Sequence, residues 1–176
     1  MNLLTQSYLK ECLDYSLDTG TFTWKTRPIE HFKTDNSQKL WNARFSNKDI
    51  GSLHCDGYFV IRLGGKNYLS HRIAWLYVHG CFPENQIDHV NGIRTDNRLI
   101  NLRPANNAEN AQNERKARLN NKSGFLGVSW NRDNKKFRAR IITNGKSKHL
   151  GYFESPEEAH ENYLQEKRKL HPYNTL

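Results

Sequence analysis

The side chains best suited to chemistry lie between residues 88 and 110 of this 176-residue chain. An adjacent acid and histidine, Asp88-His89, are followed by Asn101, Arg103 and Asn110. Carboxylate and amide oxygens are ligands for hard divalent cations, and a neutral histidine can accept a proton at neutral pH. The local pattern predicts a strand, a turn, a second strand and a helix, which would place the Asp-His pair opposite Asn110.

Strand geometry limits how Asp88 and His89 can cooperate, because neighbouring residues on a strand point to opposite faces. If both act in one cleft, they must lie where the strand breaks into its loop. Taken singly, a histidine beside an aspartate is more often an ordinary surface pair, and Asn101 could simply cap a turn. The order of the whole set favours a catalytic site.

The elements expected before residue 80 alternate between helices and strands. They are a helix over 3–15, a turn at 18–20, a strand over 21–24, a long loop over 25–50, a hairpin of strands 58–63 and 66–69, and a helix over 71–78 with Ser70 as its cap and Gly80 at its end.

Around the candidate residues, Asn91-Gly92 is the strongest hairpin signal in the chain. It joins a strand over 86–90 to an expected return strand over 96–103, with Leu99, Ile100 and Leu102 facing inward. Asn106 or Asn107 would then cap a helix that runs to about Arg118.

The segment after residue 124 predicts three strands and a final helix. These are strands over 126–130, 136–143 and 146–153, with a two-residue turn at Asn144-Gly145, and a helix from Ser155-Pro156 to about Leu170.

The central segment, about residues 57 to 115, resembles the HNH endonucleases, and more closely the homing endonucleases of phages and introns. The matching residues are His71-Arg72-Ile-Ala-Trp75, Ile87-Asp-His-Val-Asn-Gly92, Asp96-Asn-Arg98, Asn101-Leu-Arg103 and Asn110. The resemblance implies that His89 is the general base, that Asp88 and Asn110 are metal ligands, and that Asn101 holds the loop that orients His89. Asn110 stands where the family name has its last histidine, which is a common variant.

The metal implied by this resemblance is Mg²⁺, with Mn²⁺ as an alternative. Cys12, Cys55 and Cys81 show no paired spacing, so no structural zinc is expected. Arg72, Arg94, Arg98 and Arg103 are candidates to hold DNA phosphates.

Basic charge is concentrated in one part of the chain. Residues 111–148 contain eleven Lys or Arg and two acids. Their surplus of nine positive charges equals the net charge of +9 of the whole chain. A basic surplus confined to one segment indicates a polyanion partner, nucleic acid first and an acidic membrane second; a solubilising face is the alternative.

The carboxy-terminal segment resembles the APETALA/ethylene-response-factor (AP2/ERF) type of DNA-binding domain. The matching residues are Gly127-Val128, Phe137-Arg-Ala-Arg-Ile141, His149-Leu-Gly-Tyr-Phe153 and Ser155-Pro-Glu-Glu-Ala159. In that family the sheet enters the major groove. Candidate DNA-contacting residues here are Ser129, Trp130, Asn131, Arg132, Arg138, Arg140, Ile142, Lys148 and His149. Ile142 and His149 depart from plant members, so base preference is not transferred.

The expected fold class is α+β: a ββα-metal nuclease domain over 1–118, a linker over 119–124, and a three-stranded antiparallel sheet packed on one helix over 125–176. The expected function is a metal-dependent endonuclease of double-stranded DNA, of the homing type. A non-catalytic DNA-binding relic and a restriction-type nuclease are alternatives, whereas the aromatic sheet of a single-strand RNA reader is missing. A monomer is favoured, because one compact catalytic site is expected per chain. A location in the cytoplasm, that of the host if the protein is phage-encoded, is expected because no secretion signal or 18-residue apolar stretch is visible. Residues 1–56 are expected to support the nuclease hairpin.

Overall fold

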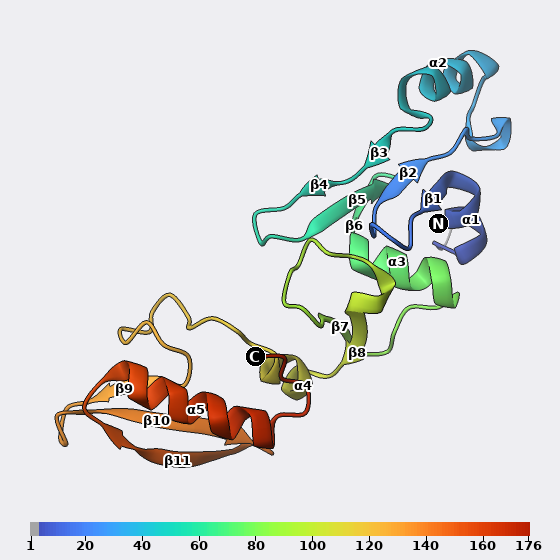
Figure 1. Ribbon diagram of the computed structural model, residues 1–176. Helices are drawn as coiled ribbons and strands as arrows, with labels where there is room; N and C mark the ends of the chain where they lie inside the picture. The colour runs from blue at the N-terminus through green and yellow to red at the C-terminus, as the bar shows by residue number, and fades with distance from the viewer. Residues whose placement is uncertain (1–3) are drawn as a thin grey trace. The chain divides into compact units, whose positions relative to one another are not determined.

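The computed structural model describes residues 4–176, which divide into two compact units, 4–104 and 105–176. Both units combine helices with small sheets (Figure 1). The elements of the first unit are α1 (Gln6–Cys12), β1 (Leu13–Tyr15), β2 (Phe22–Trp24), a 3-10 turn (Ile29–His31), α2 (Asp35–Phe45), β3 (Asp49–Ile50), β4 (Ser52–Leu53), β5 (Phe59–Leu63), β6 (Lys66–Leu69), α3 (Ser70–His79), β7 (Gln86–His89), a second 3-10 turn (Leu99–Asn101) and β8 (Leu102–Ala105), whose last residue opens the second unit.

The first sheet has the strand order β1-β2-β3, and its hairpin shortens the expected first helix. The side chain of Thr5 caps α1, which ends at Cys12. The expectation of helix up to Tyr15 is wrong, because Leu13 and Tyr15 pair with β2 across the predicted turn. Leu3, the expected start, lies outside the described residues.

The expectation of a structureless loop over 25–50 is also wrong. Thr34 and Ser37 form a reciprocal capping box that begins α2. This helix has no buried residue, so its sequence carries no apolar stripe that would reveal a helix. Instead Trp41 lies edge-on to Trp24, with ring centroids 4.9 Å apart, and the Arg27 guanidinium lies 4.9 Å from the Trp41 ring. Aromatic and cation–π contacts therefore hold this segment.

The second sheet, of order β4-β5-β6, confirms the predicted hairpin and leads into α3. Ser70 is the first residue of α3 and makes no capping bond, so its expected role as cap is wrong. Gly80 ends the helix in the left-handed conformation, as expected. The Gln6 amide donates to the carbonyls of Tyr77 and Val78, which ties α1 to the end of α3.

A single cluster of buried side chains joins these sheets and helices to the hairpin that carries the candidate residues. It comprises Leu9, Cys12, Leu13, Phe22, Ile61, Leu63, Ile73, Ala74, Leu76, Ile87 and Leu102. Ile87 and Leu102 lie on β7 and β8, so the hairpin shares its core with the amino-terminal elements.

The return strand of this hairpin begins later than expected. Strand β7 agrees with the prediction, but β8 starts at Leu102 and not at Asp96. The intervening residues form a loop and the 3-10 turn, in which Ile100 is 88% exposed and does not face inward. The longer loop leaves room for the hydrogen bonds described below.

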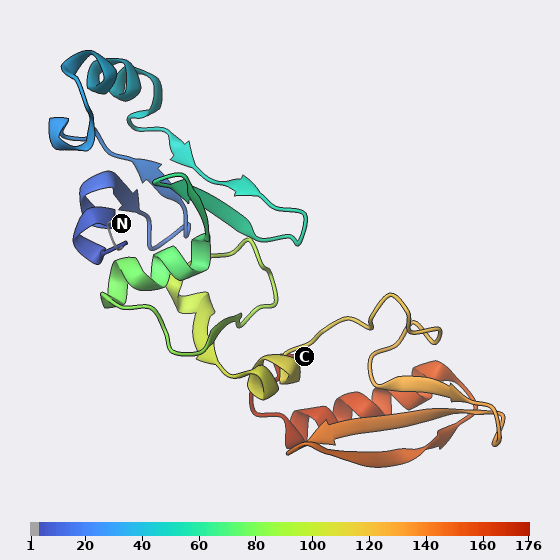
Figure 2. The ribbon, with the colours of Figure 1, turned by 180° about the vertical axis from the view of Figure 1, so that it is seen from behind.

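The second unit confirms the predicted sheet and final helix. Its elements are α4 (Asn107–Gln112), β9 (Val128–Asn131), β10 (Lys136–Thr143), β11 (Lys146–Phe153) and α5 (Pro156–Leu170). The strands pair antiparallel in the order β11-β10-β9, and Figures 1 and 2 show α5 lying along one face of the sheet. Ala139 and Ile141 of β10 are buried against Ala159 and Tyr163 of α5.

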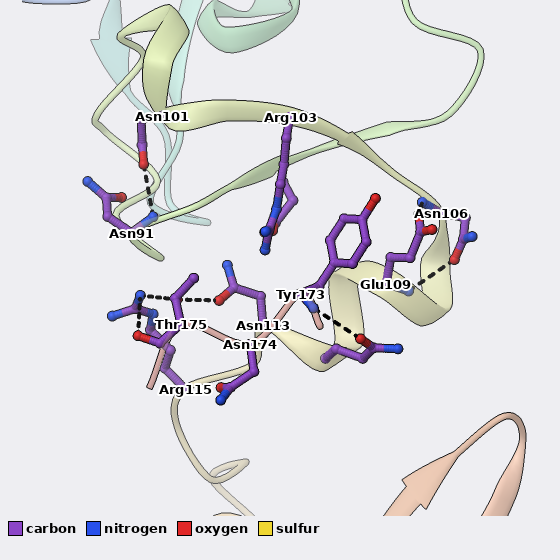
Figure 3. A network of polar contacts seen from close by, with 12 residues as sticks. Asn91, Asn101, Arg103, Asn106, Glu109, Asn113, Arg115, Tyr173, Asn174 and Thr175 are labelled. Carbon is purple, nitrogen blue, oxygen red and sulfur yellow. Dashed lines mark hydrogen bonds and ion pairs between the residues drawn. The ribbon is translucent and has the colours of Figure 1, made fainter. Parts of the chain in front are cut away.

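Helix α4 is capped by Asn106, as expected, but ends at Gln112 and not near Arg118. The residues that follow are bonded by the end of the chain. Lys167 donates to the Glu114 carbonyl, and the Thr175 hydroxyl donates to the Asn113 amide oxygen at 2.7 Å (Figure 3). Helix α4 thus belongs to the second compact unit, although the sequence placed it with the nuclease segment. No helix of residues 4–176 has both the length and the apolar character of a membrane span.

Candidate active site

Asp88 and His89 are the last two residues of β7, where the strand gives way to a loop. Both side chains are buried, at 5% and 4% exposure. The backbone continues the pairing one residue further, because the Val90 amide donates to the Asn101 carbonyl at 2.8 Å. Asp88 and His89 have different principal partners, in keeping with the alternation of side chains along a strand.

Asn101 closes the loop that follows His89. Its amide oxygen accepts from the Asn91 backbone amide at 2.8 Å (Figure 3). Its amide nitrogen donates to the Asp96 carbonyl at 2.8 Å. The Asn91 side chain adds a bond to the Asp96 carboxylate at 2.7 Å. One side chain therefore fixes both ends of the six-residue loop.

Two hydrogen bonds from Arg103 of β8 hold the Asp88 carboxylate. Arg103 donates to one carboxylate oxygen through Nε at 2.9 Å and through Nη2 at 2.7 Å. Such charge-assisted bonds are short and strong, and they fix the carboxylate in orientation as well as in charge. Arg103, expected among the DNA-contacting residues, thus contacts the acid that the sequence marked as a metal ligand.

His89 lies among polar and aromatic groups. Its Nε2 is 3.4 Å from the Asn97 amide oxygen, and its ring lies edge-on to His71, with centroids 5.0 Å apart. The Tyr58 ring completes the surroundings, 5.9 Å from that of His89. Burial lowers the pKa of His89, while the bond to Asn97 and the nearby carboxylates of Asp88 and Asp96 raise it in part.

His71 is a member of this cluster to which sequence reasoning gave no role. Its position in the His71-Arg72 block was the available signal, but nothing in the block indicates what the side chain contacts. Burial, with His89 and Arg72 nearby, lowers the pKa of His71 to about 3. His71 is therefore neutral at physiological pH, and it can neighbour His89 without charge repulsion.

The amino-terminal elements contact this loop directly. The Tyr15 hydroxyl donates to the Asn97 carbonyl at 2.7 Å. Gly20, with φ +72°, lies so close to the loop that an added Cβ would be 2.3 Å from the Arg98 nitrogen. Residues of the first hairpin thus contact the backbone of the residue that bonds His89.

Three arginines singled out in the sequence lie in the first unit and make internal contacts. Arg98 forks onto the Asp96 carboxylate at 2.8 and 2.6 Å, and this pairing lowers the pKa of Asp96 to about 2. Arg72 lies over the Phe82 ring, and Arg94 donates to the Asp56 carbonyl. These contacts position the three guanidinium groups.

Asn110 belongs to α4 in the second unit. Its backbone amide donates to the Asn106 carbonyl in the first turn of the helix. A capping box in which Asn106 and Glu109 bond reciprocally fixes that turn (Figure 3).

The open face of the carboxy-terminal sheet carries most of the other candidates. Strand register places Arg138 beside Ser129 and Tyr152, and Arg140 beside His149. Arg140 and His149 are exposed. Their neighbours in β10, Ala139 and Ile141, are buried toward α5, so alternation directs Arg138 and Arg140 to the face away from the helix.

Two candidates lie on the other side of this sheet. Lys148 pairs with Ile141 and bonds the Glu166 carboxylate of α5 at 2.7 Å. Trp130 pairs with Phe137 and stays 50% exposed. A bulge at Leu150 of β11 shifts the register so that His149 lies opposite Arg140, and no residue pattern predicted this bulge. Arg132 is exposed in the turn after β9.

Asp88 and His89 thus lie at the end of β7, and Asn101 closes the loop behind them. Residues 68–112 form an HNH endonuclease family domain, by their match to the family of that description. The matched stretch runs along the chain from β6 into α4 and includes Asp88, His89, Asn101 and Asn110.

Two relatives extend the similarity beyond this stretch. An uncharacterized HNH endonuclease, L247, of Acanthamoeba polyphaga mimivirus is 32% identical over 108 residues, which are 56% of this chain and 27% of that protein. Protein 3.8 of Escherichia phage T7 is 34% identical over 77 residues, 43% of this chain and 63% of that protein. The chain thus spans less than two thirds of either relative, and no solved structure matches it.

Proposed function

We propose that this protein is a divalent-metal-dependent endonuclease that hydrolyses phosphodiester bonds in double-stranded DNA. The observation that carries the proposal is the placement of His89: buried at the end of β7, beside Asp88, and bonded through Nε2 to Asn97. The family match over residues 68–112 supports the reaction class.

The proposed general base is His89, acting through Nδ1. The Asn97 amide nitrogen donates to the Thr95 carbonyl, which assigns the orientation of that amide and turns its oxygen to His89. An amide oxygen only accepts hydrogen bonds, so we propose the tautomer in which His89 donates through Nε2–H and uses Nδ1 as the proton acceptor. Burial lowers the pKa of His89, which favours the neutral ring that a base must have.

Asp88 and Asn110 are the proposed metal ligands. A carboxylate oxygen and an amide oxygen are the donor types that Mg²⁺ and Mn²⁺ take, so the donor chemistry of the two residues fits the group. When bound, such an ion neutralises negative charge on the phosphate and its leaving oxygen. Arg103, forked onto Asp88, fixes the carboxylate in one orientation. Asn101 is the proposed positioning residue for the loop after His89.

The order β7, β8, α4 along the chain is consistent with the ββα-metal fold, which we propose for this module. We likewise retain residues 1–118 as the nuclease part and 125–176 as an AP2/ERF-like DNA-binding part. Support for the latter is the sheet of order β11-β10-β9 with α5 on one face and arginines on the other.

The DNA-contacting residues proposed for the sheet are Arg138, Arg140 and His149, with Arg132 in the adjacent turn. Lys148 is proposed to add only weakly to the positive field and to make no base contact, because its ammonium group pairs with Glu166 on the helix side. In the nuclease part, Arg72 and Arg98 are proposed phosphate contacts. We propose an enzyme of the homing type that cuts at a specific target, because such an enzyme would combine a catalytic module with a separate DNA-binding domain.

A plasmid cleavage assay tests the proposal. We expect supercoiled DNA to be nicked or linearised with Mg²⁺ and to stay intact in excess chelator, because the ion supplies charge stabilisation that no side chain replaces. Full turnover in excess chelator would contradict the metal requirement. DNA that is bound but never cut under any divalent ion would leave a non-catalytic DNA-binding protein. Mapping the cleaved sites in a random DNA library separates a homing enzyme, with a long degenerate site, from a restriction-type enzyme.

A further inference from the structure

A second group of metal-ligating side chains lies in the turn between β4 and β5, apart from the residues proposed for catalysis. His54, Cys55 and Asp56 are consecutive and exposed, and their ligand atoms all lie within 4.8 Å of one another. Among residues 4–176, this is the group of three or more His, Cys, Asp or Glu side chains gathered closely enough to share one ion.

The turn that carries these residues is fixed by its own backbone. The His54 amide donates to the Tyr58 carbonyl at 2.8 Å, and the Gly57 amide donates to the His54 carbonyl at 2.9 Å. Gly57 has φ +84°, a conformation that costs glycine little and most other residues more.

Arg94, from the loop after β7, also holds this turn. Arg94 donates to the Asp56 carbonyl at 2.7 Å, and its guanidinium lies 4.9 Å from the Tyr58 ring centroid. The backbone of the three residues is thereby held before any ligand arrives, which reduces the entropy lost on binding.

The distances from the Cys55 sulfur to its two neighbours are close to those around a tetrahedral ion. The Cys55 sulfur is 3.5 Å from His54 Nδ1 and 3.2 Å from Asp56 Oδ1. Bonds of 2.0–2.3 Å at tetrahedral angles separate ligand atoms by about 3.3–3.8 Å. His54 and Asp56 hydrogen-bond each other directly, and their exposed side chains can part by rotation to admit an ion.

We propose that His54, Cys55 and Asp56 bind a borderline divalent transition-metal ion of the Zn²⁺ type, with one coordination position left to water. The donor set decides the class of ion. Thiolate and imidazole favour Zn²⁺ and Co²⁺, whereas the hard ions proposed for catalysis prefer oxygen alone. The sequence predicted no structural zinc because paired cysteines are lacking; this site needs only one cysteine.

Cobalt titration of the full-length, reduced protein tests the site without DNA or cleavage, so its result is independent of the proposed nuclease function. Co²⁺ should produce a thiolate-to-cobalt charge-transfer band that saturates at one equivalent. Zn²⁺ should abolish the band, and excess Mg²⁺ should leave it unchanged, because Mg²⁺ does not compete for sulfur.

Two variants and a matched control assign the band to this turn. Cys55→Ser should remove the band, and His54→Ala should weaken Co²⁺ binding by at least about tenfold, since loss of a direct ligand costs at least as much as loss of a supporting group. Cys81→Ser is the control, because Cys81 is also exposed and lies outside the group. The proposal is overturned if the wild type gives no band, or if Cys55→Ser keeps it.

Discussion

Asn101 connects two parts of the candidate site through one side chain. It accepts from the Asn91 amide and donates to the Asp96 carbonyl, and both partners flank the loop that follows His89. Its own burial leaves little room for water to replace either bond.

We expect Asn101→Ala to lower the free energy of unfolding by about 2 kcal/mol, because it leaves a donor and an acceptor without partners. Cleavage should fall further than the loss of stability explains, since the loop positions His89. Denaturant unfolding and a cleavage assay below the transition measure the two effects. Asn120→Ala, at an exposed asparagine, should change neither. A variant as stable and as active as the wild type would remove Asn101 from its proposed role.

Residue types at the site were predictable from the sequence to different degrees. Asp88, His89 and Asn101 are visible because their spacing resembles a family. The fork from Arg103 to Asp88 and the contact of His71 with His89 were not visible, since each depends on a pairing across strands or between a strand and a helix. The sequence identifies the charged and hydrogen-bonding side chains, but the strand register and the helix packing determine which of them are in contact.

At the scale of elements, the first hairpin acts as a support for the loop at residues 97–98. Tyr15 bonds the Asn97 carbonyl, and Gly20 approaches the backbone closely. The expectation that residues 1–56 support the nuclease hairpin thus gains specific contacts.

The close contact of Gly20 with the Asn97–Arg98 backbone can be tested by comparing an alanine substitution there with one at Gly64. Gly20→Ala should cost about 3 kcal/mol or more of unfolding free energy, because left-handed strain of about 1–2 kcal/mol is joined by a clash with the Asn97–Arg98 backbone. Gly64→Ala has the same left-handed strain but open space around the new methyl, so about 1 kcal/mol is expected. Thermal and denaturant unfolding measure both. Equal losses would show that the close packing is not present in solution.

Elements whose residues pair locally were predicted well, and those held by distant contacts were not. Strands β10 and β11 and helix α5 carry alternation, an Asn-Gly turn and a Ser-Pro cap. Helix α2 is held by aromatic rings and not by a buried stripe, and α1 ends where β1 pairs with β2. A helical pattern cannot reveal that a strand partner lies nine residues further on.

At the scale of the whole molecule, we propose a nuclease module joined to a basic DNA-binding sheet. The surplus of positive charge falls in residues 111–148, and within the sheet Arg138 and Arg140 lie on the open face while Lys148 lies on the helix side. Arginines on the open face can read base edges, whereas a lysine paired to α5 adds mainly to the field.

This division predicts different effects for two basic residues. Arg140→Ala should reduce discrimination between a cleaved site and scrambled DNA by about 1–3 kcal/mol, the value of one bidentate contact to guanine. Lys148→Ala should weaken binding to both DNAs nearly equally and by less, because Glu166 already neutralises it. Binding is measured at two salt concentrations, with a site taken from the cleavage library. Equal losses on both DNAs for both variants would count against a reader built on the sheet.

The most direct test of the whole account is to measure cleavage and binding of the same DNA by His89→Ala. Cleavage should fall by at least about 100-fold, because the proton acceptor is lost, while affinity for DNA stays nearly unchanged. His79→Ala, at an exposed histidine on α3, is the matched control and should cleave normally. A His89→Ala protein that is folded and cleaves DNA at the wild-type rate would contradict the account.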